Sequence, residues 1–131
     1  MAQLPVEMIL LRQLASYLAM PIFVVDADCD LLFFNEPAEP LLGRRFDETG
    51  PIPLAEWSAL FGLNDENGVP IAPDDLPIVV ATRRREQSHR RTWLRGSDGV
   101  ARPIEATSFP LLGQSGRTLG GVAIFREVRQ L

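Results

Sequence analysis

Two short apolar runs, separated by a polar cluster, stand out near the start of the chain. Residues 22–25 are β-branched and aromatic, residues 26–30 are mostly aspartate, and residues 31–34 are apolar again. Strand-forming runs around an Asp-rich turn predict a β-hairpin. Asn35 then occupies a position typical of a helix N-cap, and Gly43 is suited to ending a short helix after it.

Helical periodicity precedes the hairpin in residues 4–20. Apolar residues recur there at the spacing of one helix face, at Leu4, Met8, Leu11, Ala15 and Leu18. Three more widen the apolar stripe: Ile9, Leu10 and Leu14. Such a stripe suits a helix that covers only its own core, and it also suits a helix that contacts a partner helix. We expect the five spaced residues to form a homodimer interface.

The middle of the chain is interrupted by glycine and proline, and two segments there have helical character. Residues 54–63 carry helical periodicity. Residues 73–86 predict a longer helix, because Asp74 and Asp75 at its start and three arginines near its end suit the helix dipole.

From residue 88 onward the period becomes two. Glycine-rich turns separate three predicted strands, 88–95, 100–111 and 118–128. Strands on both sides of a helical middle predict an α+β domain, with a five-stranded antiparallel sheet and short helices on one face, preceded by the amphipathic helix. We divide the chain into a helical cap at 1–19, a domain at 20–128 and the start of a C-terminal linker at 129–131.

Composition narrows the class of protein. The chain has 131 residues, 46% of them apolar, which suits one globular domain, and no run approaches the roughly 18 apolar residues of a membrane span. The first twenty residues lack the basic start and the cleavage site of a signal peptide. The single cysteine, Cys29, excludes an internal disulfide. We therefore expect a cytoplasmic protein.

The net charge of −4 hides an uneven distribution. Residues 1–75 hold 13 of the 17 acidic residues and three arginines, whereas residues 76–131 hold four acidic residues and ten arginines. This division suggests that the two halves pack on each other or on a second copy. Six arginines within 83–95 could form a nucleic-acid surface, but the chain is acidic and lacks a reading helix, so we expect no nucleic-acid partner.

No catalytic set is evident, and we expect no enzymatic activity. His89 has no nucleophile in a recognisable motif, and no glycine-rich phosphate loop occurs. Asp26, Asp28 and Asp30 alternate along the hairpin turn and could suggest a hard-cation site. They lack the loop length and closing glutamate of an EF-hand, so we interpret them as turn residues that cap the backbone and expect no metal site.

Five short segments in a fixed order carry a family resemblance. They are Pro21-Ile-Phe-Val-Val-Asp, Phe34-Asn35 with Ala38-Glu39 and Leu42-Gly43, Asp65-Glu-Asn-Gly-Val-Pro, Asp98-Gly-Val-Ala-Arg-Pro-Ile-Glu-Ala-Thr-Ser-Phe-Pro and Gly120-Gly-Val-Ala-Ile-Phe. Together they resemble a PAS domain over about residues 10–128. The resemblance implies sensing and dimerisation inside signalling proteins, often bacterial kinases of two-component systems, cyclases or phosphatases, with an effector domain beyond the final strand.

The resemblance also allows cofactors to be tested residue by residue. Light-sensing flavin members of the family carry a cysteine after the Leu-Gly position, but Arg44 follows Gly43 here and Cys29 lies in the hairpin turn. Haem-binding members carry an axial histidine on the long helix, and residues 73–86 contain none. The resemblance therefore favours neither haem nor a flavin adduct, and it leaves the cofactor unknown.

An apolar ligand pocket is expected between the inner face of the sheet and the short helices. The candidate residues are Phe23, Val25, Phe33, Trp57, Phe61, Trp93, Phe109 and Ile124, with Asn35, Arg91 and Thr107 as polar groups. Aromatic residues in strands are ordinarily core, so a filled interior is the alternative. A slip of one residue in strand register would move each side chain to the opposite face.

We interpret the chain as a non-enzymatic sensory and interaction domain of a signalling protein. Binding of a small molecule or a partner would be coupled to the arrangement of a homodimer and to an effector domain. Two alternatives stay open: a ligand-free structural dimerisation module, and a sensor that binds haem, flavin or an organic acid.

Overall fold

A single antiparallel sheet organises the protein, and its six strands lie in the order β2-β1-β6-β5-β4-β3. The structure is a computed structural model that describes residues 5–128. The strands are β1 (Ile22–Asp26), β2 (Leu31–Phe34), β3 (Gly62–Asn64), β4 (Ser88–Arg95), β5 (Ala101–Leu112) and β6 (Thr118–Glu127). The first hairpin and the last three strands join through β1 and β6, where Val24 is opposite Val122.

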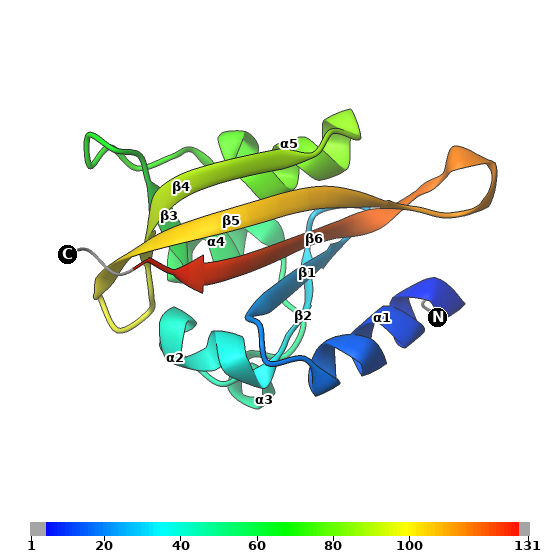
Figure 1. Ribbon diagram of the computed structural model, residues 1–131, viewed down its shortest axis with the longest axis horizontal. Helices are drawn as coiled ribbons and strands as arrows, with labels where there is room; N and C mark the ends of the chain where they lie inside the picture. The colour runs from blue at the N-terminus through cyan, green and yellow to red at the C-terminus, as the bar shows by residue number, and fades with distance from the viewer. Residues whose placement is uncertain (1–4, 129–131) are drawn as a thin grey trace.

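Helices cover both faces of this sheet. The α-helices are α1 (Val6–Tyr17), α2 (Glu39–Leu42), α3 (Phe46–Thr49), α4 (Leu54–Leu60) and α5 (Pro77–Arg84). Three single 3₁₀ turns join them to the rest of the chain: η1 (Glu36–Ala38), η2 (Pro73–Asp75) and η3 (Gln114–Gly116). Figure 1 shows α1 beside β1 and β2, well apart from α5 at the other side of the molecule.

The predicted α+β class, the hairpin predicted at residues 22–34 and the three strands predicted from residue 88 onward are confirmed. The expected number of five strands is wrong by one, because residues 62–64 pair with β4 instead of continuing the helix expected at 54–63. The helix expected at 73–86 is divided into η2 and α5. Leu76 between them is extended (φ −61°, ψ 137°), since the residue before a proline is sterically excluded from the helical region.

The apolar side chains form one cluster on each face of the sheet, as the alternation along β1 shows. Phe23 and Val25 belong to the larger cluster, which packs against α4 and α5. Ile22 and Val24 belong to the smaller cluster, which packs against α1. We call the first the inner face and the second the outer face. Both layers are therefore built on the same central strands.

Two consecutive glycines in β6 allow close approach of the layers. A Cβ atom at Gly121 would overlap the hydroxyl of Thr82 on α5. A Cβ atom at Gly120 would overlap the Val25 carbonyl of β1 and lie 3.1 Å from Met8 Cε on α1. Glycine, which lacks a Cβ atom, thus avoids both overlaps at these two positions of β6.

Candidate functional site

A cavity of about 70 Å³ lies between the inner face of the sheet and the helices that cover it. The helical side contributes Leu42, Trp57, Phe61, Leu76, Pro77 and Ile78. The sheet contributes Phe23, Leu63, Leu94, Ile104, Ala106, Ser108, Ala123 and Phe125. Every strand except β2 supplies at least one of these residues, so the cavity spans most of the sheet's width.

The wall of the cavity is aromatic and has almost no polar groups. The rings of Phe23 and Trp57 meet at an angle of 62° with centroids 5.0 Å apart, and Phe61 stands at 84° to Phe23. Trp57 Nε1 donates a hydrogen bond to the Cys29 carbonyl at 2.9 Å, which holds the indole in place and occupies its N–H. Among residues 5–128, Ser108 provides the one hydroxyl of the wall, and no charged side chain lines it.

Three of the residues expected to line a pocket do so: Phe23, Trp57 and Phe61. Val25 is buried in the same core without reaching the cavity. The others lie on the outer face or in another role: Phe33, Asn35, Arg91, Trp93, Thr107, Phe109 and Ile124. The reason is strand parity, because Leu94, Ile104 and Ala123 take the inner face and their neighbours in the sequence take the outer one.

Arg91 and Thr107 illustrate the outer-face position. Arg91 Nε lies 3.2 Å from Glu105 Oε2, and Thr107 Oγ1 lies 2.8 Å from Nδ1 of His89. Arg126 of β6 approaches the same Glu105 carboxylate at 3.4 Å. Partial removal from water raises the pKa of Glu105, but Arg126 and Arg91 outweigh that effect and leave it lowered. These polar groups form a charged cluster across three strands, away from the cavity.

Asn35 is a structural anchor that sequence reasoning placed in the pocket. Its Oδ1 accepts the Ile22 N–H at 2.9 Å, and its Nδ2 donates to the carbonyls of Ala15 at 3.0 Å and Met20 at 2.8 Å. It stands at the N-cap position of η1, as expected, but makes no side-chain cap hydrogen bond there. The buried amide instead ties the end of α1 to β1.

Helix α1 has two apolar faces. Met8 and Ala15 are buried against the outer face of the sheet, and Leu11 is half-buried beside them. A second stripe is exposed on the opposite side: Val6 (62%), Leu10 (59%), Leu14 (57%) and Tyr17 (79%). Of the expected dimer residues, Met8, Leu11 and Ala15 therefore contact their own sheet, Leu18 is exposed just after the helix, and Leu4 lies outside the described residues.

This architecture matches solved PAS and LOV structures. A PAS domain from Colwellia psychrerythraea superimposes with a TM-score of 0.66 at 17% identity, over 93% of this chain and 97% of that one. The PAS domain of BvgS from Bordetella pertussis gives 0.65 at 15% identity, over 95% and 87%. A Rhodobacter sphaeroides LOV protein gives 0.73 at 13% identity, over 96% and 70%.

The chain has a PAS-like fold. At these identities the likeness establishes the fold alone. The sequence matches no protein-family model and no curated protein. Among residues 5–128, no helix of this PAS-like domain combines the length and hydropathy needed to cross a membrane.

Thiol and imidazole groups of the PAS-like domain lie apart from its cavity wall. Cys29 is fully buried at the hairpin turn, and burial raises the pKa of its thiol. His89 is on the outer face with a side chain that is 62% exposed. Arg44 follows Gly43 at the end of α2, where Gly43 has the left-handed conformation expected of a helix terminus (φ 75°). Neither a thiol nor an imidazole is therefore directed at the cavity.

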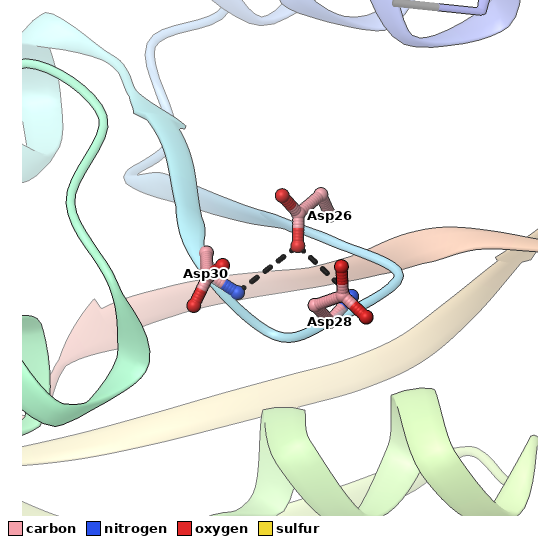
Figure 2. Close-up of side chains that lie close together, drawn as sticks. All are labelled: Asp26, Asp28 and Asp30. Atoms are coloured by element: carbon pink, nitrogen blue, oxygen red, sulfur yellow. Dashed lines mark hydrogen bonds between the residues drawn. The ribbon is translucent and has the colours of Figure 1, made fainter. Parts of the chain in front are cut away.

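The three aspartates of the hairpin turn are held close together, as Figure 2 shows. Asp26 Oδ1 accepts the N–H groups of Asp28 at 2.9 Å and Asp30 at 3.1 Å. Asp30 Oδ1 accepts the Leu54 N–H, the first of α4, at 2.9 Å. Burial raises the pKa of Asp26. The carboxylates of Asp26 and Asp30 therefore accept backbone N–H groups of the turn and of α4, which agrees with their interpretation as backbone caps.

Sequence reasoning missed most of the cavity wall. Leu42, Leu76 and Ile78 come from segments that pack over the sheet, and no local pattern shows which helical residue faces a cavity. Ile104, Ala106 and Ser108 alternate along β5, so the period of two groups them on one face, but the expected residues Thr107 and Phe109 belong to the opposite face.

Proposed function

We propose that this chain is a non-enzymatic sensory and interaction domain of a signalling protein. It binds a small molecule or a partner and forms a homodimer through α1. Binding changes the arrangement of the dimer, and this change acts on an effector domain. The PAS and LOV domains of similar structure support a signalling role, and the apolar cavity supports ligand binding.

One observation carries the proposal: β1 and β6 form the wall of the cavity on one face and the seat of α1 on the other. On β1, Phe23 lines the cavity while Val24 packs under α1. On β6, Ala123 lines the cavity while Val122 packs under α1. A ligand that shifts these strands would bind with different affinity to two arrangements of the domain that differ in the position of α1. Such a difference in affinity is the requirement for coupling.

The exposed stripe of α1 supports the homodimer. Val6, Leu10, Leu14 and Tyr17 follow one another at helical spacing on the side away from the sheet. Contiguous apolar surface of this kind is typical of protein interfaces. Two such stripes facing each other across a two-fold axis would bury them both.

The dimer is tested by sedimentation of Leu10→Glu and Leu14→Glu. Each places a charge in the exposed stripe without touching the sheet, so both variants should be monomers at concentrations where the wild type is a dimer. Ser16→Glu adds the same charge to an exposed position beside the stripe and should leave the mass unchanged. Dimers in both leucine variants would remove the interface.

A second function, a ligand-free dimerisation module, is favoured by the small volume of the cavity. Ala106→Leu distinguishes the two, because it fills the cavity from β5 without contacting α1. Coupling predicts a change of about threefold or more in the dimer dissociation constant, whereas a scaffold predicts none. Ala59→Leu, on the exposed side of α4, is the matched control.

A further inference from the structure

We infer that the cavity binds compact, neutral, apolar molecules of a few heavy atoms and excludes organic anions and extended ring cofactors. The inference names the ligand class of the proposed sensory site and so rests on that proposed function. It follows from the polarity of the cavity wall, from the volume of the cavity and from the hydrogen bonds that Trp57 and Thr82 already make.

The polar groups of the wall cannot hold a charge. Ser108 supplies one hydroxyl, and the Trp57 N–H is already donated to the Cys29 carbonyl. The Thr82 hydroxyl above the sheet donates to the Ile78 carbonyl at 2.7 Å. A carboxylate placed here would lose its hydration and gain no cationic partner, which makes its burial costly. Arg91, the one cationic residue expected from the sequence to line a pocket, pairs with Glu105 on the outer face.

The volume sets the upper size of the guest. An apolar protein cavity of roughly 150 Å³ admits benzene or xenon. The present cavity, at about 70 Å³, is about half that size. Its wall is held by close aromatic contacts, with Phe23 and Trp57 centroids 5.0 Å apart. A guest smaller than benzene therefore fits with little rearrangement, whereas a flavin or a haem would require the helices to leave the sheet.

The two tryptophans make the charge preference measurable. Trp57 lines the cavity. Trp93 of β4 precedes the cavity residue Leu94 in the sequence and therefore faces away from the cavity. In a Trp93→Phe variant, Trp57 is the only tryptophan and reports on the cavity alone. Xenon and iodide have the same number of electrons, and both quench indole fluorescence through the heavy-atom effect. They differ in charge, so they form a matched pair of probes.

We expect xenon to bind saturably, measured by ¹²⁹Xe NMR, and to quench Trp57 in the Trp93→Phe variant. Iodide should quench Trp57 about tenfold less than it quenches tryptophan amide in solution. Naphthalene, which exceeds the cavity, should not displace xenon. Quenching of Trp57 by iodide as strongly as in free tryptophan amide, or displacement of xenon by naphthalene, would overturn the inference.

Filling the cavity locates the binding. Ala123→Leu extends an inner-face side chain into the cavity and should weaken xenon binding by about tenfold or more, while Ala59→Leu should leave it unchanged. If Ala123→Leu does not fold, Ala106→Leu serves the same purpose from β5. Xenon binding that survives in a folded filling variant, or its absence from the wild type, contradicts the inference. Xenon binding together with an unaltered dimer in Ala106→Leu would leave the inference standing and remove the proposed coupling.

Discussion

At the scale of single residues, Asn35 shows how one buried amide fixes the position of a helix. Its side chain is 1% exposed and joins three backbone groups from two segments. Helix α1 also makes a cation–π contact, with the Arg12 guanidinium 5.0 Å from the centre of the Phe33 ring. The amide is the interaction that reaches into the core, so it sets where α1 ends.

Replacing Asn35 with alanine should therefore destabilise the fold by about 2–3 kcal/mol, because the buried Ile22 N–H loses its acceptor. Urea unfolding followed by circular dichroism measures this loss. Asn35→Asp keeps an acceptor for Ile22 but directs a carboxylate at two carbonyls, so it should not restore stability. A loss of less than about 0.5 kcal/mol for alanine would show that water replaces the amide.

Asp26 offers a second residue-scale prediction. Because burial raises its pKa, the folded state favours the neutral carboxyl, and ionisation at neutral pH lowers stability. Asp26→Asn removes the charge and keeps an oxygen for the N–H groups of Asp28 and Asp30. We expect this variant to be as stable as the wild type or slightly more so at pH 7, and Asp26→Ala to lose about 1 kcal/mol with the turn. If the turn bound a cation, Asp26→Asn would instead be less stable than the wild type in the presence of calcium.

Elements of the fold were predictable where a pattern was long, and less so where a tertiary contact decided the outcome. The eight residues of β4 and the hairpin of β1 and β2 follow from alternation and turn chemistry. The three residues of β3 carry no such pattern and become a strand through pairing with β4. The role of Asn35 was equally hidden, because its partners lie 13 to 20 residues away along the chain.

The β4–β5 hairpin supplies the C-terminal partners of α2. The Ser97 N–H donates to the Leu42 carbonyl at 2.8 Å, and Arg102 Nη1 donates to the Leu41 carbonyl at 3.3 Å. Arg102 also pairs with Asp98 at 3.2 Å and lies 3.9 Å from Glu127. These bonds satisfy carbonyls that the short helix cannot pair itself.

Arg102→Met keeps most of the apolar stem and removes the hydrogen bond to the Leu41 carbonyl and the contacts with Asp98 and Glu127. We expect a loss of about 1 kcal/mol in the free energy of unfolding, together with faster amide exchange at Ser97. Arg90→Met, at an exposed position in β4, should change neither quantity. Equal effects from the two variants would indicate that net charge, and not the contact with α2, is responsible.

At the scale of the whole molecule, the acidic and basic halves meet chiefly through the sheet. Of the ion pairs within residues 5–128, only Asp74 with Arg83 joins the two halves, at 2.8 Å. The seam itself consists of β1–β6 and β3–β4 hydrogen bonds and of apolar side chains. The prediction that the halves pack on each other is compatible with this arrangement, but charge contributes little to it.

The charged cluster of the outer face should make stability depend on pH. Because the pKa of Glu105 is lowered in the folded state, its ionised form adds stability above its unfolded pKa, and this addition disappears as the pH falls through the folded value. Glu105→Gln should therefore lower the urea midpoint at pH 7 and have little effect in strong acid, below about pH 3. A difference from wild type that is constant across this range would argue against the carboxylate.

The cavity wall was the least predictable feature, because it is a property of packing across the whole domain. Phe23, Trp57 and Phe61 were found from their size and apolar character. The inner residues of β4, β5 and β6 depended on a register that one residue reverses, as Trp93 and Leu94 show.

The adjacent glycines of β6 offer independent access to the two layers of the molecule. A methyl group at Gly121 would meet Thr82 on α5, and one at Gly120 would meet the edge of β1 beside Met8. Alanine at Gly121 would thus press on α5, whereas alanine at Gly120 would press on the β1 backbone and on Met8 of α1. Comparing each alanine variant with the double variant would reveal whether the two displacements add or oppose each other.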